Sequence, residues 1–445
     1  MSTSGPLQFD VLTGPLPVDP TLPAFMVSTT RGFLPRQDPI TTLPNDFDAL
    51  ESILSRMPIK TASGTPGLLA NFTLGPTVHK ELPDLTSAIE KYRDDLPLMN
   101  ALYRDYAFLA SAYLLEPCHE RFMRGENYGL GRQSLPSSIA LPIVKVAEMY
   151  FTSAGFKPFM EYAGSYALFN YRLVEPDLGL EYSNLRLIRA FEHGLDPSLL
   201  RQVSSSYMSP WCGIPARLSP VPLPRWTAVR GVIVIDALVE VNKVMNTMWR
   251  HSKPAQYTSF RTFIFGITKQ TMFPNGVVYE GVSEEPMSFR GESGANDSMI
   301  PLCDNLLQIT MPETPLTDIL RDFRSYRPGN HREFLEAVKD CAEGNGLRSY
   351  ALEDAGSAAL YLRALNQVRD FRWRHWCFTR EYVLKQTKYP WLPNQLQAVL
   401  AQMVAVGPHC GNARGTADIM DVVRAQQETL RKEVEKYCME RSVAV

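Results

Sequence analysis

YLRALNQVRDFRWRHWCFTREYVL, residues 361–384, is the stretch of sequence that decides the fold of this chain. Its apolar and aromatic side chains recur in steps of three or four residues, at Tyr361, Leu365, Val368, Phe371, His375, Phe378 and Tyr382. That spacing is the period of an α-helix with one apolar face. The stretch lies within the longest periodic segment, 354–388, which predicts a long helix carrying His375 on its apolar face.

A histidine on an apolar helix face needs a partner for its ring nitrogens. Burying an imidazole without one costs roughly 1–3 kcal/mol. Periodicity alone leaves two interpretations open. His375 is either a core histidine hydrogen-bonded to a backbone carbonyl, or an axial ligand of haem iron. A neutral imidazole that projects from a helix into an apolar slot suits the second chemistry.

Helical patterns dominate the rest of the chain as well. Further helices are predicted over 98–116, 141–151, 226–250 and 298–309, and a charged amphipathic helix over 418–437. Two segments interrupt this pattern. Residues 209–226 hold five prolines and are expected to form a long surface loop, and residues 279–298 are small, polar and glycine-containing.

The first 45 residues carry eight prolines and are expected to form an extended arm. We therefore predict an all-α fold in two unequal parts after this arm. A smaller, mainly helical N-terminal domain would span residues 46–150, and a large helical domain residues 151–445.

Composition excludes several function classes. Lys+Arg 45 against Asp+Glu 47 gives a net charge of -2, which argues against nucleic acid as a partner. The most apolar stretch, 226–248, is interrupted by four charged residues, so no membrane span is expected. The N-terminus shows no signal-peptide pattern, and the seven scattered cysteines form no Cys-x-x-Cys pair. A reduced, cytoplasmic protein is the expectation.

Two common catalytic centres find little support. The other six histidines share no His-x-x-x-His spacing, so a zinc site is not indicated. The chain also lacks Gly-x-Ser-x-Gly, so a serine hydrolase is not indicated either.

Seven segments, taken together, resemble the indoleamine 2,3-dioxygenase family, haem enzymes of the tryptophan dioxygenase superfamily. They recur in the family's order and at near-family spacing from about residue 80 onward. The segments are LPSSIALPIVKVAEMY (135–150), EYAGSYALFNY (161–171), GVVYEGV (276–282), SFRGESGANDS (288–298), RPGNHREFL (327–335), RHWCFTREYVL (374–384) and ARGTADIM (413–420). The resemblance implies a helical fold with haem b as cofactor, held by the large domain.

The resemblance assigns residues to both faces of the haem. His375 matches the family's proximal ligand, and Arg372 an arginine that supports a haem propionate, with Asp304 as its acidic neighbour. The other interpretation of this pair is a surface salt bridge worth at most ~1 kcal/mol. On the distal face, the family's loop of small residues falls on Gly291–Ala295, with Ser293, Gly294 and Ala295 as site candidates. Small residues there would let the backbone approach the ligands closely.

The resemblance also assigns substrate contacts. Arg261 has the spacing, fifteen residues before Gly276, of the arginine that grips the substrate carboxylate, and a guanidinium fork suits that anion. Ser204 matches a distal serine near the indole nitrogen. Positions of the pocket wall fall on Tyr162, Ser165, Leu200, Gln256 and Tyr257. In a C-terminal loop shortened relative to the family, Thr416 would contact the substrate ammonium and Arg414 would cap the pocket mouth.

These assignments imply a haem-dependent dioxygenase that opens the indole 2,3-bond of L-tryptophan with O2, giving N-formylkynurenine in the kynurenine pathway of tryptophan catabolism. The expected partners are a small indole and O2, and a monomer is expected. A first alternative keeps the haem but acts on a modified indole in secondary metabolism, since Leu200 and Gln256 stand where the family has aromatic rings. A second is a non-catalytic haem-binding protein, against which a retained Arg261 argues.

Overall fold

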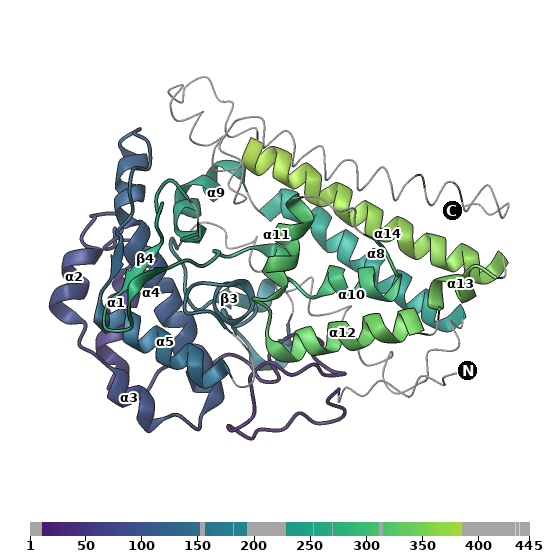
Figure 1. The fold of residues 1–445 in the computed structure, drawn as a ribbon, viewed down its shortest axis with the longest axis horizontal. Coiled ribbons are helices and arrows are strands. Elements are labelled where there is room, and N and C mark those ends of the chain that lie inside the picture. Colours follow the sequence, from purple (N-terminus) through teal and green to yellow (C-terminus); the bar gives the residue numbers. More distant parts are fainter. Residues whose placement is uncertain are drawn as a thin grey trace.

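The computed structural model describes residues 11–151, 156–180, 182–193, 228–251, 253–268, 270–310, 315–344, 346–353 and 355–384, together with Lys432 and Lys436. Helices make up most of these ranges, as the sequence predicts (Figure 1). None of the described helices is both long and apolar enough to cross a membrane. The expected 209–226 loop and the expected 418–437 helix, apart from Lys432 and Lys436, lie outside the described residues.

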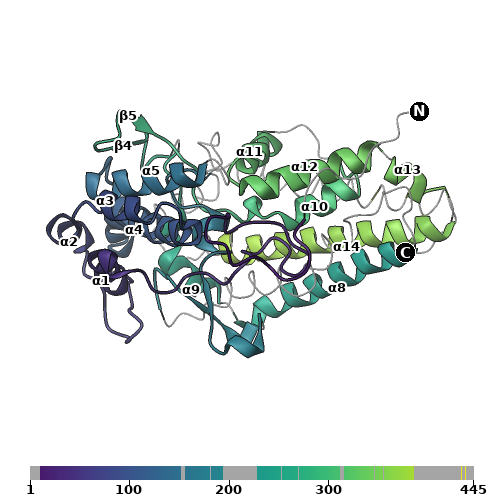
Figure 2. The same cartoon turned by 90° about the horizontal axis from the view of Figure 1, so that it is seen from below.

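The predicted long helix is confirmed as α14, Ala355–Thr379, which continues into a π-helical turn, Arg380–Leu384. It runs beside α8, Ala228–His251, in both views (Figures 1 and 2). On its apolar face Leu365 and Val368 are buried. Polar side chains also link the two helices, because Arg374 Nη1 donates to Asn242 Oδ1 at 3.0 Å.

The N-terminal helices gather at one end of the molecule (Figure 1). They are α1 (Asp48–Arg56), α2 (Leu74–Glu81), α3 (Thr86–Lys91), α4 (Leu96–Met123) and α5 (Ser137–Phe151). The helix predicted over 98–116 is α4, and it is longer at both ends. Its start follows from local chemistry, since Pro97 occupies the first turn and the Asp95 carboxylate accepts from Leu98 N at 3.0 Å.

The remaining helices are α9 (Pro254–Phe260), α10 (Met299–Leu306), α11 (Pro315–Arg324), α12 (Gly329–Gly344) and α13 (Leu347–Ala351). Of these, α10 to α13 lie on one side of α8 and α14, and α9 lies near one end of this pair (Figure 2). The predicted helix 298–309 is confirmed as α10, and it packs on α12. Together α8, α10, α12 and α14 enclose a hydrophobic core.

Short strands, which the periodicity did not predict, complete the fold. Strand β1 (Ser134–Leu135) pairs in parallel with β4 (Val277–Tyr279), which pairs antiparallel with β5 (Ser283–Met287). A second sheet joins β2 (Tyr171–Leu173) to β3 (Leu185–Leu187). Strands this short are too brief to show a clear alternation of apolar and polar residues. The GVVYEGV segment forms β4 and the turn of a hairpin whose second strand is β5, and Gly281 in this turn has φ 79.

The proline-rich arm packs into the body of the protein. Its described part contains no helix before Asn45, in agreement with the expectation of an extended segment. Phe25 lies edge-on against Phe156 in one hydrophobic core, and Val27 is buried in the other. The first core includes side chains from Ala24 to Phe289. A domain boundary near residue 150 stays a prediction.

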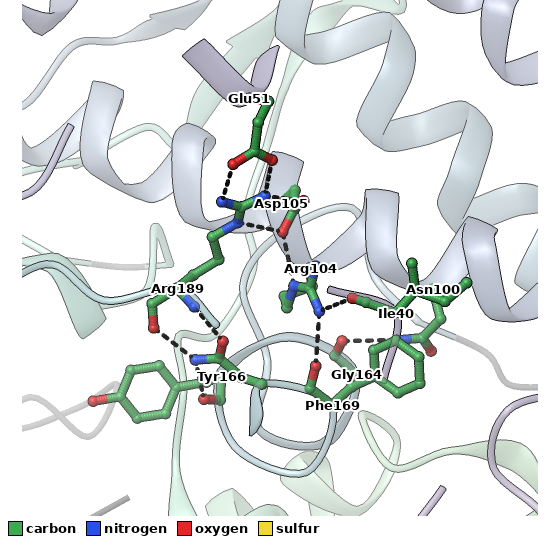
Figure 3. Close-up of polar contacts among 10 residues, drawn as sticks. Ile40, Glu51, Asn100, Arg104, Asp105, Gly164, Tyr166, Phe169 and Arg189 are labelled. Carbon is green, nitrogen blue, oxygen red and sulfur yellow. Dashed lines mark hydrogen bonds and ion pairs between the residues drawn. The ribbon is translucent and has the colours of Figure 1, made fainter. Parts of the chain in front are cut away.

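A buried cluster of charges holds α1, α4 and the segment after β3 together (Figure 3). Asp105 on α4 accepts from Arg104 Nε at 2.7 Å and from Arg189 Nη2 at 2.7 Å, and Arg189 also pairs with Glu51. Burial alone would raise the pKa of Asp105, but the guanidinium groups of Arg104 and Arg189 outweigh it and lower this pKa to about 2. Arg104 Nη1 also donates to the Phe169 carbonyl at 3.3 Å.

Asp105→Asn should destabilise the fold strongly, because two largely buried guanidinium groups would lose their shared anion. We expect a loss of roughly 3–5 kcal/mol in the free energy of unfolding, measured by urea denaturation. Since the folded pKa of Asp105 lies below its unfolded value, its contribution is present above about pH 4 and is lost as the pH falls through about 2. The control is Asp46→Asn, which removes the exposed ion pair with Lys91. Equal effects of the two substitutions would contradict this role.

Candidate functional site

His375 lies one turn before the end of α14, and its environment differs from that of the other residues on the same face. His375 is exposed to water, whereas Phe371 before it on this face is half-buried and Phe378 after it is buried. Desolvation by the surrounding protein nevertheless lowers the pKa of His375. The structure thus disfavours a histidine packed among core side chains, and the lowered pKa favours the neutral form of its ring.

Arg372 and Asp304 form an ion pair close to His375. Arg372 Nη2 donates to Asp304 Oδ1 at 2.7 Å, linking α14 to α10. The side chains are 16% and 5% exposed, so the pair is not the surface salt bridge that was the other interpretation. Burial raises the pKa of Asp304, and Arg372 counteracts this effect. Within the described residues the pair leaves Arg372 Nη1 and Nε without an acceptor, so they can bind another anion.

The loop of residues 291–297, just before α10, is built for a close backbone approach. Ser293 Oγ accepts from Ala295 N at 3.2 Å, and its own hydroxyl hydrogen has no acceptor among the described residues. Gly294 is exposed, and a Cβ added there would meet nothing within 4 Å. The Ser293–Ala295 segment therefore borders open space, with one hydroxyl available as a donor.

Arg327 holds this loop in place, a role that the sequence did not reveal. Arg327 is buried before α12 and donates to the carbonyls of Ala295 and Asn296, each at 3.1 Å. Burial lowers its pKa to about 10, so it remains charged at neutral pH. Among the sequence signals, only its place in the RPGNHREFL segment pointed to this residue.

Two glycines bring the turn that carries Arg261 against the 291–297 loop. A Cβ at Gly266 would lie 2.8 Å from the Phe289 carbonyl oxygen and collide with the backbone of Gly291. A Cβ at Gly291 would lie 2.6 Å from the Ile264 oxygen. Ile267 N also donates to the Phe289 carbonyl at 2.8 Å. Only residues without a side chain permit this backbone contact.

Arg261 opens the 3₁₀ turn Arg261–Ile264 after α9 and is half-buried. Its guanidinium lies 5.7 Å from the ring centres of both Tyr257 and Phe265. Among the described residues, its side chain has no hydrogen bond and no ion pair. A partly desolvated guanidinium without an anion is a site for an anionic ligand.

Tyr257 connects Arg261 with the His375 helix. Its ring lies edge-on to Tyr382, in the π-helical turn that follows α14, with 6.3 Å between the ring centres. Tyr257 thus lies between the Arg261 guanidinium and the end of α14. The neighbouring residue Gln256 belongs to α9, but its side chain is outside those described.

Tyr162 and Ser165 lie in the short π-helical turn Tyr162–Tyr166 and are both buried. Ser165 Oγ donates to the Glu161 carbonyl at 2.6 Å and accepts from Glu161 N at 2.9 Å. These bonds stay within the turn. A substrate contact of either residue stays a prediction. Leu200, Ser204, Arg414 and Thr416 lie outside the described residues.

Glu292 is the site residue that sequence reasoning passed over. It is a half-buried glutamate in the 291–297 loop, whose other residues at 291–295 are glycine, serine and alanine. Burial, with the charge of Glu161 as a second cause, raises the pKa of Glu292 to about 8. The signal in the sequence that could have identified Glu292 was its position as the one acidic residue among the small residues 291–295.

Comparison with known proteins shows the family to which the chain belongs. The family model described as indoleamine 2,3-dioxygenase matches residues 21–207 and 232–431. The chain belongs to this family. It is 26% identical over 391 residues to indoleamine 2,3-dioxygenase acdA of Aspergillus candidus, covering 81% of this chain and 88% of that one.

Two further relatives are similar over comparable lengths. Indoleamine 2,3-dioxygenase 1 of Rattus norvegicus is 24% identical over 392 residues, covering 84% of this chain and 88% of the relative. Indoleamine 2,3-dioxygenase of Saccharomyces cerevisiae is 24% identical over 398 residues, covering 83% and 81%. Members of the family are haem-dependent dioxygenases of indoles, so the chain is a haem-dependent oxidoreductase.

The described residues fit a haem. The imidazole of His375, whose lowered pKa favours the neutral form, has the chemistry of the nitrogen ligand that haem iron takes. The free donors of Arg372 suit a propionate. The open space at Gly294 and the free hydroxyl of Ser293 suit the opposite face.

Gly266→Ala should disturb this family site through the backbone alone, because the added Cβ must push the Arg261 turn away from the 291–297 loop. We expect a loss of about 1–3 kcal/mol in unfolding free energy and weaker indole binding, measured by urea denaturation and calorimetry. The control is Gly344→Ala, at the end of α12, where a Cβ meets nothing within 4 Å. If Gly266→Ala matched the control in both measurements, the contact would not organise the site.

Proposed function

We propose that this enzyme opens the indole 2,3-bond of L-tryptophan with O2 to give N-formylkynurenine. The observation that carries the proposal is Arg261, a half-buried guanidinium over two aromatic rings with no anion among the described residues. An indole that carries a carboxylate would supply the anion for Arg261 and a flat ring that can pack on the neighbouring aromatic side chains. Both oxygen atoms of O2 enter the product, so the reaction needs no further reductant.

His375 would hold the haem through its iron. Arg372, fixed by Asp304, would bind a propionate, and Ser293 with Ala295 would line the opposite face. When bound, the haem supplies the site where O2 is held and activated.

The other residues of the chain would position the substrate. Arg261 would bind the carboxylate through two parallel hydrogen bonds and so fix the orientation of the indole. The backbone at Gly294 would allow the ring to approach closely, because no side chain occupies that space. Tyr257, beneath Arg261, would pack on the bound molecule and exclude water. General acid or base catalysis is not required of these side chains.

His375→Ala should abolish most haem binding, because no other imidazole of α14 can replace the ligand. The haem content of purified protein, measured from the Soret band, should fall to a small fraction of the wild-type value. Added imidazole should restore part of it by occupying the vacated position. The control is His79→Ala, an exposed histidine on α2. Full haem content in His375→Ala would refute the assignment.

Arg261→Ala should weaken L-tryptophan binding by ~2–4 kcal/mol, the cost of losing a charge-assisted contact. Arg261→Lys should recover only part of this loss, since an ammonium lacks the planar fork. Binding is measured by calorimetry on the haem-loaded protein, and formylkynurenine formation is followed by absorbance.

Arg250→Ala, which removes an exposed arginine of α8, is the matched control. Unchanged tryptophan affinity in Arg261→Ala would rule out the carboxylate site. If the wild-type enzyme oxidised another indole but produced no formylkynurenine from tryptophan, the modified-indole alternative would replace the proposal.

A further inference from the structure

Glu292 is a carboxyl group without a partner at the edge of the site. Its side chain is half-buried and, among the described residues, forms no hydrogen bond and no ion pair. Isolated charges in such surroundings are costly, and proteins normally pair them. The raised pKa agrees with this isolation, since no nearby cation counteracts the effect of burial.

The surroundings of Glu292 are aromatic and anionic. Its charge acts on the hydroxyl of Tyr166, from the π-helical turn, and on that of Tyr257, from α9. Glu161, which precedes the turn, is the other carboxyl group close enough to act on it. The Glu161 carboxylate is already occupied, because it accepts from the backbone N–H groups of Ala163 and Ser165 at 2.8 and 3.1 Å. Glu292 is therefore the member of this pair that can accept a ligand.

Arg261 and Glu292 are opposite charges that do not pair with each other. Tyr257 responds to both, since the charge of Arg261 lowers its pKa and the charge of Glu292 raises it. Their loops are joined by the contact between Gly266 and Gly291. Yet no ion pair within 4.0 Å connects the two side chains, and neither has another partner in the described part of the chain. Once Glu292 is ionised, a ligand that carries both an anion and a cation would give each of these side chains a partner.

We propose that Glu292 binds the protonated amine of the substrate while Arg261 binds its carboxylate, so that the enzyme selects indoles with a free α-amino acid group. This inference rests on the proposed function and deepens it, because it names the substrate class. An indole whose amine is acylated or absent leaves Glu292 without a cation. The glutamate thus discriminates by charge, in addition to the shape of the pocket.

Pairing with an ammonium also moves a proton. At pH 7 the Glu292 carboxyl group is largely protonated, because its pKa is about 8. It must ionise to bind the cationic amine, and the proton passes to the solvent. The groups that face it are Glu161, Tyr166, Tyr257 and, beyond the Tyr257 ring, Arg261. Burial raises the pKa of Glu161 to about 8 as well, so the released proton is assigned to Glu292 only by its loss in Glu292→Gln.

The test compares three indoles on the haem-loaded enzyme by calorimetry. L-Tryptophan carries both charges, tryptamine only the ammonium, and indole-3-propionate only the carboxylate. Glu292→Gln, which keeps the size of the side chain, should weaken the binding of L-tryptophan and tryptamine by about tenfold or more and leave indole-3-propionate unchanged. Arg261→Ala should show the complementary pattern, with tryptamine unchanged. Glu285→Gln, an exposed carboxylate on β5, is the control.

A second readout separates recognition from a structural role. Titration in two buffers of different ionisation enthalpy should show proton release when wild type binds an amine at pH 7, and none with Glu292→Gln. If Glu292→Gln weakened the binding of all three indoles equally, or of none of them, the inference would be overturned while the proposed function would stand. Failure of wild type to bind either carboxylate-bearing indole would instead overturn the proposed function, and this inference with it.

Discussion

The buried carboxylate of Asp105 is the interaction on which the rest of the structure depends (Figure 3). It neutralises two guanidinium groups, Arg104 from its own helix and Arg189 from the segment that follows β3. A cluster of this kind contributes little to stability compared with a well-packed apolar core, but removing one member leaves charges buried without partners. It therefore acts as a constraint on which segments can lie side by side.

Hydrogen bonds from side chains of α4 to the backbone connect this charge cluster with the candidate site. Arg104 donates to the carbonyls of Ile40 and Phe169, and Asn100, one turn earlier on α4, donates to the Gly164 carbonyl at 2.9 Å. These bonds fix the π-helical turn that contains Tyr162 and Tyr166. That turn packs against the short 3₁₀ turn Gly294–Asn296 in the 291–297 loop. The helical end of the molecule thus positions a loop that is far away in sequence.

The site itself is held together mainly by backbone contacts. Gly266 and Gly291 touch through their main chains, and Arg327 holds the loop by its carbonyl oxygens. Side chains that would otherwise be needed for structure are then available for ligands. Arg261 and Glu292 are two such side chains, because neither forms a hydrogen bond or an ion pair among the described residues. Such unpaired charges are tolerated where a ligand completes them.

The sequence by itself determined the helical fold, the apolar face of α14 and the position of His375 on it, because a period of three to four residues is a local property. Ordered motifs determined the family, since seven short segments in register do not depend on the fold being known. The short strands escaped prediction because two to five residues carry no clear alternation. Only the tertiary structure could decide that His375 is exposed, that Arg261 and Glu292 lack an ion-pair partner among the described residues, and that Arg327 holds the 291–297 loop. Exposure and pairing depend on neighbours from distant segments, and no local pattern encodes them.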